Sequence, residues 1–510
     1  MRCIVWPPRW NDIANLHKGK YRSKLLPHHF YRYIYNKTLL MSMPANVSAK
    51  SPSLSRVLGL TTAILLVSGM MIGSGVFKKI VPMAQSGLSQ GGILLAWTIA
   101  GIITMLGAFT MAGLSSLTEE SGGMYEYLRL AFGNFFSFLF GWTDFAVIGS
   151  ASIAAVAFIF AQTINTFIAL PNPLQAWEHI AIANIIFPFA DSGIKLVAIA
   201  AIMLLTWVNC RGVQNGGMIN NIITSAKIGG IIILIVFGLL YTAPVADMPV
   251  TTPAPEKLNS SLFLSAIFGA MLNAFWAYDG WANISFISGE IKNPRKNIPL
   301  AIITGVSIAM TVYLLINFVY MHVLPLQQLA AVDRNTIGAA VVAEKLLGHS
   351  GQTVIVALIM VSVFGTLNGL IMSHSRVYFR MAQEKYFFTN AASVHPKYKT
   401  PHISLLYTMA WSCVLVISGT FDMLTDMVIF TAFLFFGLMA VALIKLKRNG
   451  TITAKVTGYP LVPVVFILFT AALLVNTFIS APGQTIIGIL LTLSGVLFYY
   501  YFKQKGSKED

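Results

Sequence analysis

The sequence predicts an all-α, polytopic membrane protein, and its composition and its apolar periodicity both lead there. Of its 510 residues, 56% are hydrophobic and 10% are charged, whereas soluble domains carry about 25% charged residues. The mean hydropathy is +0.72, and from residue 57 onward apolar runs of membrane-spanning length follow one another. A soluble chain of this composition would expose large apolar patches. These observations exclude a soluble enzyme, a disordered protein and a disulfide scaffold.

Residues 1–56 are expected to form a basic tail. They hold ten of the 34 Lys and Arg residues and one acid, Asp12. No short apolar stretch ends there in a small-residue cleavage site, so we expect no cleavable signal peptide. Met41 and Met43 precede the first span, which favours a start assigned too far upstream or a disordered tail. The alternative is a basic arm that touches anionic lipid.

The apolar runs predict about twelve spans, after which residues 504–510 form a short tail. The expected spans are 57–82, 91–115, 133–166, 193–210, 218–243, 261–289, 299–324, 351–383, 403–420, 424–445, 459–480 and 484–503. The loops between them leave no room for a soluble catalytic module, so any function must lie among the helices.

The distribution of basic residues predicts that both termini lie in the cytoplasm. This topology puts 27 Lys and Arg inside and six outside, with Lys227 left within a span. The net charge of +16 therefore reflects the positive-inside rule, and we expect no nucleic-acid partner. The loop at 116–132 resists this pattern, since it carries three glutamates against Arg129. Acidic residues weigh little in the rule, so the orientation stands as the prediction.

The first span contains a run of glycines in residues 68–77. Gly69, Gly73 and Gly75 weaken a helix there. Gly69 and Gly73 fit the small-xxx-small spacing of tight helix packing. The alternative is an unwound break whose half-helices present bare N–H and C=O groups to a ligand.

The sixth span is interrupted at residues 275–281, where Asp279 stands next to Gly280. Irregular backbone at membrane depth is tolerated where it lines a cavity or is buried in protein. An acid in such a segment is a functional-site hypothesis, although Asp279 could instead cap a helix fragment. Flaws at corresponding places in two halves of a chain point to the site of an inverted-repeat transporter.

Four further residues within spans carry charge or can titrate. Lys227 could snorkel to the cytoplasmic surface or act as a fixed internal cation bonded to the carbonyls of a broken helix. Asp144 is expected to be structural or interfacial, and His374, beside Arg376, is expected to be solvated. His322 and His374 have no ligand partner at helical spacing, so we expect no metal site.

Five motifs in order give a resemblance to a known family. They are residues 73–77 (GSGVF), 121–128 (SGGMYEYL), 208–213 (VNCRGV) leading to Lys227, 277–281 (AYDGW) followed by 289–294 (GEIKNP), and 364–369 (FGTLNG) with Arg376. The chain resembles the amino acid–polyamine–organocation transporters from about residue 54 to 445. Within them it is most similar to the L-type amino acid transporter branch, in a bacterial, serine/threonine-exchanger-like form.

The resemblance implies a LeuT-type fold of five-plus-five inverted repeats and two extra helices. The repeats would span 57–243 and 261–445, and the extra helices 459–503. The implied substrate site comprises Gly69, Met70, Gly73, Ser74, Gly75, Trp276, Ala277, Tyr278 and Asp279. The substrate carboxylate would meet backbone N–H groups at residues 73–75, and its ammonium group would meet carbonyls near residues 67–69 and 276–277. Lys227 would replace a sodium ion and tether the first helix, and Trp276 would gate the site from outside.

The implied function is sodium-independent exchange of neutral amino acids across the cytoplasmic membrane by alternating access. Proton-coupled symport is the alternative, and a transporter-like amino acid sensor is the hypothesis from another class. No nucleophile–base pair or metal cluster is apparent, so we expect neither an enzyme nor a cofactor. Animal members of the branch carry a cysteine that bonds to a heavy-chain subunit. The corresponding loop here, residues 169–173, has none, so we expect no such partner.

Overall fold

The computed structural model describes residues 56–181, 187–242, 260–333 and 336–509. The side chains of 213–220, 260–261 and 506–509 are not described. Apart from Arg56, the predicted basic tail lies outside these residues.

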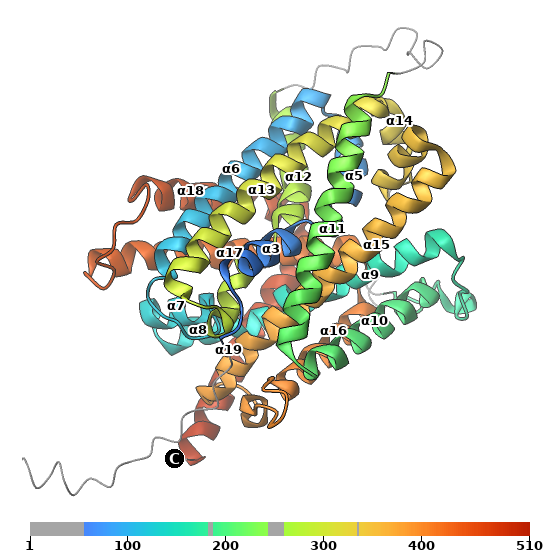
Figure 1. Ribbon diagram of the computed structural model, residues 1–510. Helices are drawn as coiled ribbons and strands as arrows, with labels where there is room; N and C mark the ends of the chain where they lie inside the picture. Colours follow the sequence, from blue (N-terminus) through green and yellow to red (C-terminus); the bar gives the residue numbers. More distant parts are fainter. Residues whose placement is uncertain (1–55, 182–186, 243–259, 334–335, 510) are drawn as a thin grey trace, which may run out of the picture. The chain divides into compact units, whose positions relative to one another are not determined.

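The described residues are organised as helices, in an order close to the prediction (Figure 1). The first half comprises α3 (Leu60–Met71), α4 (Ser74–Lys78), α5 (Ile80–Ala84), α6 (Gln90–Leu114), α7 (Met124–Phe132), α8 (Asn134–Thr143), η2 (Asp144–Ile148), α9 (Gly149–Phe167), η3 (Gln175–Trp177), α10 (Ser192–Cys210) and α11 (Val213–Leu239). The second half comprises α12 (Ser260–Tyr278), η5 (Asn283–Glu290), α13 (Pro294–Val323), α14 (Leu326–Ala331), α15 (Gly338–Gln383), η6 (Thr389–Ala392), α16 (His402–Ser418), α17 (Phe421–Arg448), α18 (Leu461–Ser480) and α19 (Pro482–Glu509).

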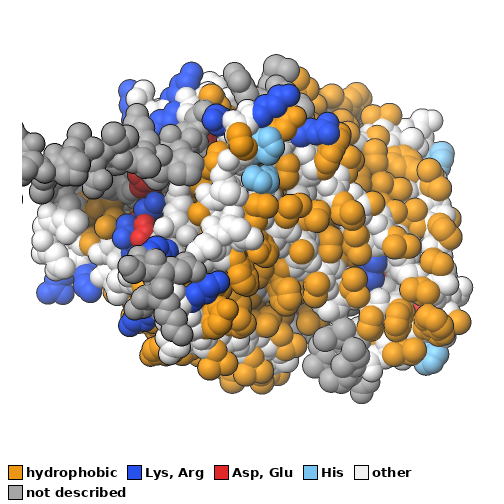
Figure 2. Space-filling model, turned by 90° about the horizontal axis from the view of Figure 1, so that it is seen from below, with side chains coloured by type: hydrophobic (Ala, Val, Ile, Leu, Met, Phe, Trp, Pro, Cys, Tyr) orange, Lys and Arg blue, Asp and Glu red, His pale blue; other side chains and the backbone are white. Residues whose placement is uncertain are grey.

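Eleven spans within the described residues are long and apolar enough to cross a membrane. The predicted span 403–420 corresponds to α16, which has 17 residues and is shorter than the rest. The all-α, polytopic fold is therefore confirmed. Figure 2 shows hydrophobic side chains over much of the visible face, with Lys and Arg mainly in its upper and left parts. Leu240, Leu468 and Leu490 are among the exposed apolar residues, as expected for helices that face lipid.

Local sequence signals set the ends and bends of several helices. Ser89 caps α6 by accepting a hydrogen bond from the backbone N–H of Gly92 at 3.2 Å. Pro294 opens α13 at a position where a missing N–H costs nothing. Within α15, Gly348 has a φ of 70°, which separates a short first part from the predicted span 351–383.

The end of the chain is helical. Residues 504–509 of the predicted tail continue α19 to Glu509. Lys and Gln sustain a helix well, and the single Gly506 does not stop it.

The helices surround α3, the first half of the interrupted first span. α3 packs against α11, α13 and α15, while α13 also runs along α6, and α15 along α9. α18 and α19 pack on α17, outside the ten helices of the two predicted repeats. The first and sixth spans are both interrupted, as a LeuT-type inverted repeat requires.

Candidate substrate site

The first span is broken at Ile72 and Gly73. α3 ends at Met71, Ile72 has φ −74° and ψ 75°, and Gly73 has φ −122° and ψ −133°. α4 then begins at Ser74. The last carbonyls of one helix and the first N–H groups of the next lack helical partners, so both kinds of group meet at this break.

Lys227 on α11 is directed at the break. Its Nζ lies 2.8 Å from the carbonyl oxygen of Gly69 and 2.9 Å from that of Ile72. It also lies 3.2 Å from the carbonyl oxygen of Ser362 and 3.3 Å from Oγ1 of Thr366. Lys227 is 2% exposed, so it does not snorkel to a surface. It holds the end of α3 against α15 through charge-assisted hydrogen bonds.

The glycines of this span also serve close packing. A Cβ on Gly73 would lie 2.9 Å from Thr366 Cγ2, and a Cβ on Gly75 would lie 2.5 Å from Ala277 Cα. The break and the tight packing therefore occur together, and the two interpretations of the glycine run are compatible. A side chain added at Gly75 would collide with α12, so such a substitution would test packing rather than anion recognition.

The sixth span is also interrupted, next to the break in the first span. α12 ends at Tyr278, Gly280 has a φ of 102°, and η5 begins at Asn283. The hydroxyl of Tyr313 lies 2.6 Å from the carbonyl oxygen of Met71 and 2.8 Å from that of Ala277, so it can donate to either. The two breaks thus face each other and share a hydrogen-bond donor.

A small cavity lies between the two breaks. Its volume is about 20 Å³, room for roughly one water molecule, so the site must widen before it can hold an amino acid. Six of the nine predicted substrate residues line it: Met70, Gly73, Ser74, Gly75, Trp276 and Asp279.

The other three predicted residues lie apart from the cavity lining. Gly69 carries its carbonyl to Lys227, and Ala277 packs on Gly75. The Tyr278 hydroxyl donates to the carbonyl oxygen of Trp97 at 3.3 Å, and its ring packs edge-on against Trp97 and Tyr313. Tyr278 is therefore directed into the packing between α6, α12 and α13.

The lining also includes residues that sequence reasoning did not place there. They are Met71, Ser152, Val156, Thr366 and Leu370. Ser152 belongs to a run of small residues in the third span, and Thr366 to the FGTLNG motif, which were the available signals. Val156 and Leu370 carry no such signal, because the sequence does not distinguish an apolar residue that faces a cavity from one that faces lipid.

His374 overturns an expectation. It is 2% exposed rather than solvated, and its Nδ1 lies 3.0 Å from both carboxylate oxygens of Asp144, which is fully buried. Asp144 is 230 residues away from His374 in sequence, so no local sequence pattern indicates that the two are in contact. Within the described residues, no group of three His, Cys, Asp or Glu gathers to hold a metal.

The comparison with known protein families decides what this site belongs to. The family model described as "Amino acid permease" matches residues 58–501, which is most of the chain. The chain belongs to the amino acid permease family. The resemblance to amino acid–polyamine–organocation transporters is thereby confirmed.

Individual permeases give the same assignment. The chain is 32% identical over 459 residues to the serine/threonine exchanger SteT of Bacillus subtilis. This alignment covers 89% of this chain and 98% of that protein. It is 28% identical over 456 residues to the b(0,+)-type amino acid transporter 1 of Mus musculus, covering 89% of each. It is also 28% identical over 452 residues to the mouse large neutral amino acids transporter small subunit 2, covering 88% of this chain and 81% of that protein.

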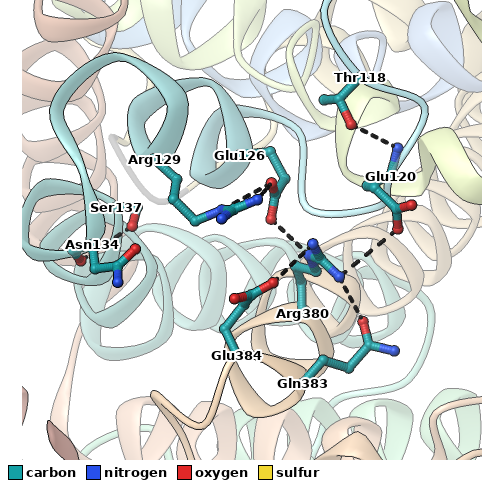
Figure 3. Close-up of polar contacts among 9 residues, drawn as sticks. All are labelled: Thr118, Glu120, Glu126, Arg129, Asn134, Ser137, Arg380, Gln383 and Glu384. Carbon is teal, nitrogen blue, oxygen red and sulfur yellow. Dashed lines mark hydrogen bonds and ion pairs between the residues drawn. The ribbon is translucent and has the colours of Figure 1, made fainter. Parts of the chain in front are cut away.

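The permease has an ion-pair network where α7 meets the end of α15 (Figure 3). This side of the helices is called the α7 end. The Glu126 carboxylate, 1% exposed, accepts from Arg129 Nη2 at 2.8 Å and from Arg380 Nε at 2.6 Å. Arg380 also pairs with Glu384 at 2.9 Å and Glu120 at 3.8 Å. Burial lowers the pKa of Arg129, but the bond to Glu126 outweighs it, so that pKa lies above its ordinary value. The network links α7 to the end of α15.

A second contact closes the same end. The backbone N–H of Leu58 donates to the carbonyl oxygen of Glu290 at 3.0 Å, and the N–H of Lys292 donates to that of Leu58 at 2.8 Å. The chain entering α3 is thus bonded to the chain leaving η5. The segment before α3 and the segment after η5 are therefore held together at the α7 end.

Aromatic packing covers the other side of the cavity. Trp276 packs edge-on against Phe421 with ring centroids 5.9 Å apart. Nζ of Lys78 and Nζ of Lys79 lie 4.5 and 4.8 Å from the Phe421 centroid. Both lysines are among the six counted on the outer side, and each is 2% exposed, because α4 and its C-cap carry them into the packing against α17.

Proposed function

We propose that this permease is a sodium-independent exchanger of neutral amino acids that works by alternating access around its two broken helices. The observation that carries the proposal is the set of oxygens around Nζ of Lys227. Carbonyl oxygens that converge at a helix break are suited to a cation. Here a covalently attached ammonium group occupies that place, so a sodium ion is not needed to hold α3.

The substrate binds between the breaks, and backbone groups recognise its α-amino acid portion. Its carboxylate accepts from N–H groups at the start of α4, around Ser74 and Gly75, where the partial positive charge of a helix end favours an anion. Its ammonium group faces the carbonyls that end α3 and the segment from Trp276 to Asp279. Trp276, packed on Phe421, closes the site toward the outside.

The lining of the cavity, in which Asp279 is the one charged residue, supports the proposed substrate class. Met70, Val156 and Leu370 are apolar, and Ser152 and Thr366 are small and uncharged. Such a wall suits a neutral side chain better than a charged one. The exchange of serine and threonine named for the Bacillus subtilis relative is consistent with this class.

The membrane and the assembly are part of the proposal. The permease is an integral membrane protein, and we assign it to the cytoplasmic membrane with both termini inside. Cysteine occurs only at positions 3, 210 and 413, so the loop at 169–173 offers no thiol to a partner. We therefore propose that it works without a disulfide-linked heavy chain.

Proton-coupled symport is the second candidate, and Asp279 favours it. This acid lines the cavity beside Trp276, where a proton could accompany the substrate. Asp144 does not line this cavity.

Uptake into proteoliposomes tests the proposed function. Labelled amino acids would be offered with and without amino acids inside, without sodium, and with an imposed pH gradient. Uptake that needs internal amino acid, does not need sodium and is not driven by the pH gradient is expected. Uptake into empty vesicles that rises with an inward proton gradient would establish symport instead.

A further inference from the structure

The pair formed by His374 and Asp144 lies outside the cavity lining and is not used by the proposed mechanism. Both side chains are buried in membrane-spanning segments, α15 and η2. A buried carboxylate is costly unless it is paired, and an ionisable residue at membrane depth is a functional-site hypothesis. Histidine is also the side chain that changes charge near neutral pH.

The backbone around the pair is adapted to it. Asp144 is the first residue of a π-helical turn. Such turns are rare in proteins, and those that occur are often at functional sites. The hydroxyl of Tyr378 donates to the backbone carbonyl of Asp144 at 3.1 Å. A Cβ on Gly149 would lie 2.6 Å from His374 Nδ1, so the imidazole packs where only glycine leaves room.

The other ring nitrogen reaches the broken sixth span. His374 Nε2 lies 3.4 Å from Nδ2 of Asn283, the first residue of η5. In the neutral ring, Nδ1–H donates to Asp144 and Nε2 accepts from the Asn283 amide. A doubly protonated ring carries N–H on both nitrogens, and Nε2–H would then oppose the N–H groups of that amide. Protonation therefore breaks this bond as it is now oriented, and restoring it requires the Asn283 amide to turn so that its oxygen accepts. The buried pair of Arg376 and Glu290 remains as a second bond between α15 and η5, at 2.8 Å.

The charged and titratable groups around this ring come from several elements. The carboxylate of Asp144 contacts it directly, and Asp279 is close enough to interact electrostatically with both members of the pair. On α15 itself, Arg376 follows two residues later, and its guanidinium is paired with Glu290 at 2.8 Å. The Tyr378 hydroxyl donates to the backbone carbonyl of Asp144. The remaining neighbour on η5, Phe286, is an uncharged ring at 5.4 Å.

We propose that His374 and Asp144 form a proton-binding site that controls the separation of η5 from α15 during exchange. This inference rests on the proposed function, because alternating access requires the broken spans to move against the other helices. A proton on His374 removes a bond that holds η5 in the closed position at the α7 end. Acid accordingly speeds the opening of that end.

The pH dependence of exchange is the first test. Exchange of labelled L-serine would be measured in proteoliposomes at pH 6 and pH 8, equal on both sides, with an ionophore present. The loss of one hydrogen bond predicts exchange roughly threefold to tenfold faster at pH 6. His374→Gln keeps a donor toward Asp144 but cannot titrate there, so its ratio should approach one. His322→Gln is the matched control, because His322 is an exposed histidine of α13 and should leave the ratio unchanged.

Asn283→Asp separates a proton switch from a merely structural contact. A carboxylate accepts from Nε2–H of the protonated ring, so acid should now strengthen the contact and invert the ratio to below one. A purely structural contact would not invert it. A wild-type ratio near one, or an unchanged ratio in His374→Gln, would overturn the proposal.

A second measurement does not need transport and so separates this inference from the proposed function. Ser288 on η5 is 1% exposed, and Ser288→Cys in a cysteine-free background should react with a maleimide only when the α7 end opens. Its labelling rate, divided by that of the exposed Thr451→Cys, should be higher at pH 6 than at pH 8, and His374→Gln should abolish the difference. Absence of serine exchange together with this pattern would refute only the exchange function. If the labelling ratio had the same pH dependence with and without His374→Gln, the proposed switch would be refuted.

Discussion

At the residue scale, the Nζ atom of Lys227 joins α3 and α15 through oxygens of both helices. We predict that Lys227→Met lowers L-serine exchange at least tenfold, because the carbonyls of Gly69 and Ile72 lose their charged donor. They keep the hydroxyl donors of Thr366 and Ser362, at 2.9 and 3.3 Å. A hydrogen bond to a charged group contributes about 1.5–3 kcal/mol, and both carbonyls lie at the break. Exchange in proteoliposomes, normalised to folded protein by gel filtration, measures the effect.

Lys195 offers a matched control for that variant. It is also a buried lysine bonded to backbone carbonyls, including that of Ile417 at 3.0 Å, but it lies on α10 and does not line the cavity. Lys195→Met should lower thermal stability and leave exchange per folded molecule within about twofold. Equal loss of exchange in both variants, or near-normal exchange in Lys227→Met, would contradict the tether.

Some residues of the site were predictable from sequence and others were not. Lys227, Asp279 and the glycine run stand out because such residues are rare in apolar spans. The direction of Tyr278 could not be predicted, because helical periodicity no longer fixes side-chain direction where α12 ends. The burial of His374 depends on Asp144, and a partner so distant in sequence leaves no local pattern.

At the element scale, α7 is held to α15 by the buried carboxylate of Glu126. We predict that Glu126→Gln lowers the free energy of unfolding by about 2 kcal/mol, because two hydrogen bonds to arginines lose their charge. Glu119→Gln is the control. Glu119 pairs with Arg56 and Arg295, but its side chain is 36% exposed, and exposed pairs contribute about 0–1 kcal/mol. Thermal unfolding in detergent, followed by tryptophan fluorescence, compares them, and equal shifts would contradict a special role for α7.

The elements themselves were largely predictable, and their irregularities were not. The predicted span 91–115 is α6, Gln90–Leu114, because lipid-length apolar runs with polar ends define such helices. The predicted break in the first span falls at residues 72–73, within the glycine run. The π-turn at residues 144–148 was missed, since nothing in its composition distinguishes it from an α-helix. The turn places Asp144 against His374 and Tyr378, two residues of α15 that are distant in sequence.

At the scale of the whole molecule, the distribution of charge predicts its orientation in the membrane. The predicted topology places 27 Lys and Arg on one side and six on the other, and such an excess marks the cytoplasmic side. The end of α17 carries Lys445, Lys447 and Arg448 on the predicted cytoplasmic side. The segment after it is therefore expected inside, and the connection between α9 and α10 outside.

Cysteine labelling of intact cells measures this orientation. In a cysteine-free background, Ala176→Cys lies in the exposed α9–α10 connection and Thr451→Cys in the exposed segment after α17. A membrane-impermeant maleimide should label Ala176→Cys in intact cells and Thr451→Cys only after the cells are permeabilised. The reverse pattern would place the α7 end outside. The network around Glu126 would then close the outer side of the site, and the packing of Trp276 on Phe421 would close the inner one.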